Sequence, residues 1–147
     1  MGYVKRGNLS AVLRASGPEF DVDSFLRESA YAGASVYRRG EPRFPTKPES
    51  RKREESGITI LVSNADFDDF PTQVQESIEF LEHNANEMMR LANYPGVIGV
   101  EIDFGVRWRE TFTHSDWFPA NLVKLAGICG IGLRVSHYPI TDGTPES

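Results

Sequence analysis

The chain has 147 residues, of which 39% are hydrophobic and 25% are charged, and its formal net charge at pH 7 is −5. This length and composition are typical of one globular domain that can bury its own core without disulfide or metal crosslinks. The single cysteine, Cys129, excludes an internal disulfide and any cysteine-rich zinc or iron–sulfur site.

The first 38 residues predict a strand, a short helix and a second strand. Residues 9–15 alternate between apolar and polar side chains, which is typical of a strand with one buried face. Asp21 is a suitable helix cap, and Phe20 and Phe25 occupy the two positions of a hydrophobic staple across it. The helix should end at Gly33, and residues 34–38 follow as a short strand.

The segment from residue 39 to residue 56 has a different composition. It contains three prolines and a dense run of charges, and Phe44 is its one large apolar residue. Such a segment cannot bury enough apolar surface to offset the entropy lost when it becomes ordered. We therefore predict a long exposed loop at about 39–56 inside a single α/β domain that spans residues 1–147.

A strand over residues 58–63 and the longest helix follow this loop. The helix should begin near Asp69 and end near Asn93, because Pro95 and Gly96 form a strong stop. Its apolar positions recur at spacings of three and four and form a buried stripe: Val74, Ile78, Leu81, Ala85, Met88 and Ala92.

The clearest strand lies after this helix, between residues 98 and 108. One face is apolar and the other is polar or glycine, so the apolar face should be buried: Ile98, Val100, Ile102, Phe104 and Val106. A third helix should be capped by Ser115 or Asp116 and end at Gly130, and a last strand should cover residues 131–136.

This order of elements predicts an α+β fold. Strands with a single buried face, interleaved with helices, indicate a mainly antiparallel sheet with the helices packed on one face. A ferredoxin-like α/β plait variant, with one added helix and strand, is the nearest standard architecture.

Three stretches carry a resemblance to known proteins: the strand at residues 9–14, the helix start at Asp21 and the turn at residues 38–42. Together they resemble an uncharacterised bacterial family of small α/β proteins that is classed as a domain of unknown function. The chain departs from that pattern at residues 57–59, where a tryptophan would be expected early in the strand. The family implies no catalytic residues, and it favours an accessory or binding role.

Two carboxylates on the polar face of the 98–108 strand are the main candidates for chemistry. Glu101 and Asp103 are close enough to bind a metal or to act as an acid–base pair. Arg14, Arg107 or Arg134 could instead pair with them on a solvated face, which is the common arrangement on a strand. Asn64, Asp66 and Asp68 alternate like calcium ligands, but Asp69 and Gln75 stand where the motif needs glycine and glutamate.

No cofactor is expected, and the acidic body should repel nucleic acid. No membrane segment is apparent in the sequence, so a soluble cytoplasmic protein is expected. We expect a non-enzymatic protein-binding module, such as an immunity protein neutralising a bacterial toxin, with a basic protein partner. The alternatives are a small-ligand-binding regulator or enzyme using carboxylates on the exposed sheet face, and a homo-oligomer. Acids and aromatics at the ends of elements are the predicted contact residues: Asp66, Asp68, Glu101, Asp103, Trp108, Glu110 and Trp117.

Overall fold

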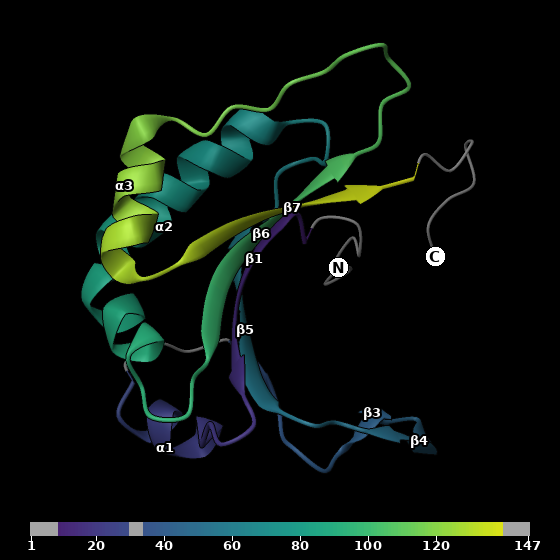
Figure 1. Cartoon of the computed structure of the whole chain (residues 1–147), viewed down its shortest axis with the longest axis vertical. Helices are drawn as coiled ribbons and strands as arrows, with labels where there is room; N and C mark the ends of the chain where they lie inside the picture. The colour runs from purple at the N-terminus through teal and green to yellow at the C-terminus, as the bar shows by residue number, and fades with distance from the viewer. Residues whose placement is uncertain (1–8, 30–33, 140–147) are drawn as a thin grey trace, which may run out of the picture.

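The computed structural model describes residues 9–29 and 34–139 (Figure 1). Within them the elements follow in the order β1 (Ala11–Gly17), α1 (Val22–Arg27), β2 (Ser35–Tyr37), β3 (Pro42–Phe44), β4 (Lys47–Lys52), β5 (Ser56–Ser63), α2 (Phe70–Ala92), β6 (Gly99–Arg107), α3 (Ala120–Cys129) and β7 (Gly132–Tyr138).

Five strands form the main sheet in the order β2-β5-β1-β6-β7. β1 pairs antiparallel with both β5 and β6, β2 pairs antiparallel with β5, and β7 is parallel to β6. The helices lie on one side of this sheet, and the other side, which we call the open face, has no described helix over it (Figure 1). The predicted α+β class and the mainly antiparallel sheet are therefore confirmed.

The segment expected to be a loop holds a two-stranded hairpin, β3–β4, that projects from the end of the main sheet (Figure 1). Its side chains are mostly exposed. The Ser50 hydroxyl lies 3.1 Å from the Phe44 amide nitrogen and 3.4 Å from its carbonyl oxygen, and Arg53 donates its amide to the Glu41 carbonyl at 2.8 Å. Hydrogen bonds across the ribbon, rather than buried apolar surface, give this segment its form.

The helix ends mostly follow the predicted capping residues, but α1 ends at Arg27, well before the predicted end at Gly33, which lies outside the described residues. Asp21 accepts a hydrogen bond from the Ser24 amide at 3.0 Å, and Asp69 accepts one from the Thr72 amide at 3.2 Å. Gly130 ends α3 in the left-handed conformation, with φ of 79°. α2 has a kink at Asn84, whose side chain donates to the Phe80 carbonyl at 2.9 Å.

The predicted start of α3 is wrong. The helix begins at Ala120 with Pro119 in the cap position, not at Ser115 or Asp116. The carboxylate of Asp116 binds the Arg109 guanidinium instead, at 3.0 Å through each oxygen. The segment before the helix stays non-helical, and Phe118 within it packs against the core.

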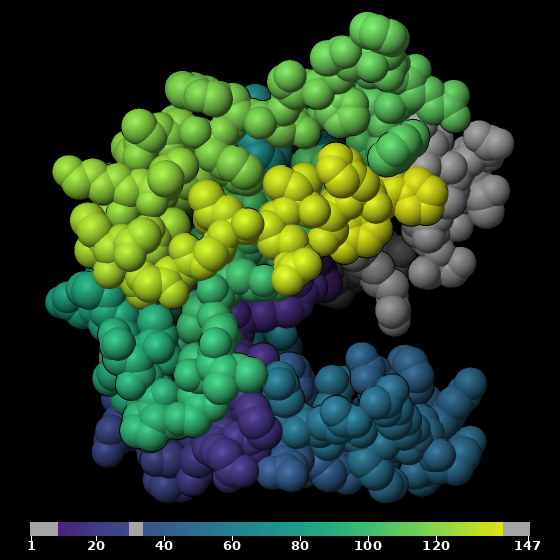
Figure 2. All heavy atoms as spheres, viewed as in Figure 1, coloured from purple at the N-terminus to yellow at the C-terminus, as the bar shows by residue number. Residues whose placement is uncertain are grey.

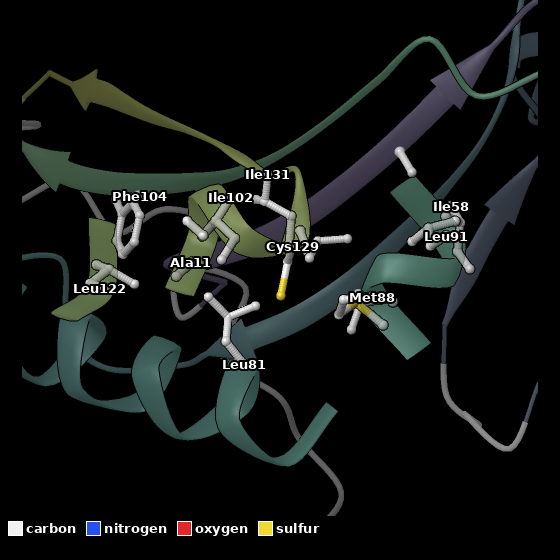
Figure 3. Packing of buried hydrophobic residues seen from close by; sticks show 14 of the residues in the cluster. Ala11, Ile58, Leu81, Met88, Leu91, Ile102, Phe104, Leu122, Cys129 and Ile131 are labelled. Atoms are coloured by element: carbon white, nitrogen blue, oxygen red, sulfur yellow. The ribbon is translucent and has the colours of Figure 1, made fainter. Parts of the chain in front are cut away.

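The core lies between the sheet and the helices α2 and α3, and Figure 3 shows its central residues. On β6, Ile102, Phe104 and Val106 are buried as predicted. The prediction for Ile98 is wrong, because this side chain is 71% exposed. β6 begins only at Gly99, and the turn before it directs Val97 against the core in place of Ile98.

Candidate functional site

The seven predicted contact residues fall in two groups. Asp66, Asp68, Trp108, Glu110 and Trp117 lie beyond the ends of β5 and β6, whereas Glu101 and Asp103 lie on the open face. About 13 Å separates Asp103 from Arg107, at the end of β6, because a strand rises roughly 3.3 Å per residue. The structure therefore gives two candidate surfaces and not one continuous site.

On the open face each carboxylate holds an arginine. Asp103 Oδ2 lies 2.6 Å from Arg14 Nη1, and Asp103 Oδ1 accepts a hydrogen bond from the Ser136 hydroxyl at 2.7 Å. Glu101 Oε2 lies 2.8 Å from Arg134 Nε. Asp103 was expected on a solvated face, but it is only 7% exposed, because these two partners lie against it. The sequence offered two interpretations of these acids, a metal or acid–base site and pairing with arginines. The structure agrees with the pairing.

A depression of about 500 Å³ lies beside this network on the open face. Arg14, Ser16, Tyr37, Glu101 and Arg134 contribute to its lining. In the space-filling view the molecule is hollowed between β7 and the β3–β4 hairpin (Figure 2). Sequence patterns show the alternation of each strand but not which strands are neighbours, so the depression could not be predicted.

The second surface, which we call the rim, comprises the loop 64–69 before α2 and the loop 108–119 before α3. Asp68 Oδ1 lies 3.1 Å from Arg107 Nε, and the Arg107 amide donates to the Phe67 carbonyl at 3.4 Å, so the two loops are joined. Asp66 accepts a hydrogen bond from the amide of Asp68 at 2.9 Å, which shapes a tight turn.

The longer loop of the rim is held at both ends and across its middle. The Trp108 amide donates to the Tyr138 carbonyl at 2.7 Å. The ion pair between Arg109 and Asp116 links the two sides of the loop between these two residues. At the far end, the Phe118 ring packs against Phe70 and Phe104, with ring centres 5.4 and 5.2 Å away. The backbone of this loop is therefore braced, although few of its side chains are buried.

Three large aromatic side chains of the rim face solvent. Trp108 is 50% exposed, Trp117 is 76% exposed, and Phe112 is fully exposed. The sequence predicted the two tryptophans as contact residues but missed Phe112. A phenylalanine inside an otherwise polar turn was the signal that could have found it.

The alternation of the last strand predicts His137 on the inward side, together with Leu133 and Val135, but His137 is exposed. It lies beside Trp108, with ring centres 5.9 Å apart, and the two line a hollow of about 380 Å³ together with Glu110 and Pro139. β7 is an edge strand of the main sheet, and its end extends past the helices (Figure 1).

Cys129, on α3, is buried in the core. Burial raises the pKa of its thiol, which keeps the protonated form and opposes nucleophilic reactivity. Among residues 9–29 and 34–139, no cluster of three or more His, Cys, Asp or Glu side chains is placed to hold a metal ion.

Comparison with protein-family models, with curated proteins and with solved structures finds no match to this chain. The resemblance to a bacterial family therefore remains a prediction. None of the helices in the described part of the chain has both the length and the apolar character needed to cross a membrane.

Proposed function

We propose that this protein is a non-enzymatic protein-binding module that uses the rim. The observation that carries the proposal is the exposure of Trp108, Phe112 and Trp117 on one braced loop. Large aromatic side chains are enriched among the residues that dominate binding energy at protein interfaces. Covering one such side chain contributes about 1.5–3 kcal/mol.

The bracing of the loop supports the same function. Binding is weakened when a loop must lose its freedom on contact with a partner. Here Trp108 is tied to the end of β7, and the Arg109–Asp116 pair holds the turn between the two tryptophans. The aromatic side chains are thus presented on a backbone that has little further freedom to lose.

The charges of the rim favour a basic partner. Asp66 and Asp68 are exposed beside the aromatics, and Glu110 adds a third exposed carboxylate. Asp68 forms an ion pair with Arg107, which offsets its charge. The remaining carboxylates still leave the rim with more negative than positive charge. Opposite charge accelerates association, which suits an immunity protein that captures a basic toxin. We propose the cytoplasm as its location, where the one thiol would stay reduced.

The open-face carboxylates support binding over catalysis. Glu101 and Asp103 each hold an arginine at 2.8 and 2.6 Å, so both carboxylates are already engaged in ion pairs within the protein. We also propose that the sheet is a ferredoxin-like α/β plait variant. In support, β1 and β2 flank β5, and β5 and β6 flank β1, so two β-α-β units interleave.

The test compares proteins captured from host lysate by the immobilised wild-type chain and by variants. Phe112→Ala combined with Trp117→Ala should reduce capture of a specific protein at least about 30-fold, since residues that dominate an interface each contribute 2 kcal/mol or more. Phe44→Ala is the matched control, because Phe44 is exposed on the hairpin, far along the chain from the rim. The proposal fails if both variants capture the same proteins in the same amounts.

The charge component is tested on the captured partner. Reversal of Asp66 and Asp68 to lysine should slow association more than it accelerates dissociation, and added salt should have the same effect. An association rate that stays the same after both the charge reversal and the addition of salt would show that the partner is not recognised by its charge.

A further inference from the structure

The depression on the open face has a floor of small residues. Ser16 and Gly99 are cross-strand neighbours on β1 and β6, and Gly132 lies opposite Glu101 on β7. A Cβ atom added at Gly99 would meet nothing within 4 Å, and one at Gly132 would come no closer than 3.8 Å to its nearest neighbour. The backbone of these strands is therefore open to close approach by a ligand.

Two arginines stand over this floor in a fixed arrangement. In the sheet register Arg14 is opposite Glu101 and Arg134 is opposite Asp103, but the ion pairs run diagonally, from Arg14 to Asp103 and from Arg134 to Glu101. Asp103 is itself held by the Ser136 hydroxyl at 2.7 Å. Each guanidinium is thus oriented by an acid, and the acid that holds Arg14 is itself restrained.

Most donors of these arginines remain available. Arg134 binds Glu101 through Nε, which leaves both terminal nitrogens without a partner among the described residues. Arg14 binds Asp103 through Nη1 alone. A guanidinium edge with two parallel donors matches the oxygens of a carboxylate or a phosphate. The acids cancel the charge of the arginines, so attraction must come mainly from directed hydrogen bonds.

Further groups at the mouth of the depression favour an anion. Tyr37 lies over Gly57, where an added Cβ would collide with the phenol ring, and the Arg53 guanidinium lies 4.1 Å from the centre of that ring. Arg53 belongs to a neighbouring hollow, which it lines together with Tyr37, Glu54 and Glu55, so it lies next to the depression and not in its lining. The hydroxyls of Ser16 and Tyr37 offer two neutral donors to the same space.

We propose that this depression binds a small anionic ligand that carries phosphate or carboxylate groups, with Arg14 and Arg134 as the recognising residues. Its volume of about 500 Å³ lies within the range of small-molecule sites. This ligand site is separate from the rim, and it assigns Glu101 and Asp103 to positioning the two arginines.

Calorimetric titration of the full chain with pyrophosphate and with citrate tests the proposal, with sodium chloride at matched ionic strength as the reference. Saturable binding of either anion is expected, and the tighter of the two identifies the phosphate-bearing or the carboxylate-bearing class. Arg134→Gln should weaken binding at least 10-fold. Arg27→Gln, on the exposed last turn of α1, should leave it unchanged.

A second variant separates binding from folding. Gly99→Leu places a side chain on the floor at a position where an added Cβ meets nothing within 4 Å, so its melting temperature should stay near that of the wild type while the anion is excluded. The inference is overturned if neither anion saturates by about 10 mM, which corresponds to less than roughly 3 kcal/mol of binding. Equal weakening by Arg134→Gln and Arg27→Gln, or unchanged binding by Gly99→Leu, would also overturn it.

Discussion

Phe104 should be the side chain on β6 whose loss destabilises the fold most. It is fully buried, and its ring centre lies 5.6 Å from that of Phe70 and 5.2 Å from that of Phe118. Replacement of a core phenylalanine by alanine costs about 3–5 kcal/mol. Each aromatic contact contributes about 0.5–1.5 kcal/mol beyond the buried area, which places this substitution in the upper half of that range.

The expected change in melting temperature follows from the size of the chain. Unfolding entropy of about 2.1 cal/mol/K per residue gives about 0.3 kcal/mol/K for 147 residues. A loss of about 4–5 kcal/mol should therefore lower the melting temperature of Phe104→Ala by about 15 °C, measured by circular dichroism. Phe112→Ala is the matched control, and its fully exposed ring should leave the free energy of unfolding within about 0.5 kcal/mol.

A shift of only a degree or two in the melting temperature of Phe104→Ala would contradict the conclusion that Phe104 is a tightly packed core residue. Equal shifts for Phe104→Ala and Phe112→Ala would be as damaging, because they would show that burial does not distinguish the two rings.

Two glycines should respond oppositely to alanine in urea unfolding. Gly17→Ala would collide with the backbone carbonyl of Gly96 and should lose about 3 kcal/mol, whereas Gly127→Ala meets nothing within 4 Å on α3 and should gain about 0.5–1 kcal/mol; changes of the same sign would contradict this. Hydrogen bonding from Arg90 lowers the pKa of Glu87, so its carboxylate stabilises the fold above its usual pKa, and this stabilisation is lost as the pH falls through the lowered value. The stability advantage of wild type over Glu87→Gln, about 1 kcal/mol at pH 7, should thus shrink as the pH falls below the usual glutamate range, and a difference independent of pH would refute it.

Much of the candidate site could be predicted from the sequence, because many of its residues lie where helices and strands end. Trp108 and Trp117 follow a strand and precede a helix, and exposure at such positions is common. The pairing of Glu101 and Asp103 with arginines was also expected, since all lie on polar strand faces. Their diagonal partners were not, because a sequence does not reveal that β7 lies beside β6 in parallel register.

The hairpin and the bracing of the rim could not be predicted for a related reason. Apolar periodicity reports which residues become buried, and β3 and β4 bury little. They are ordered by hydrogen bonds such as those of Ser50 to Phe44. In the same way Asp116 has the chemistry of a helix cap, but Arg109 seven residues earlier competes for its carboxylate.

The sequence by itself determined the type and approximate extent of the strands and helices outside the hairpin, because alternation, helical spacing and capping residues such as Asp21 and Asp69 are local properties. The tertiary structure decided which faces meet. Ile98 is apolar yet exposed, and Asp103 is charged yet buried. Both outcomes depend on neighbours distant in the chain, since burial is set by the strands and side chains packed against a residue and not by its own polarity.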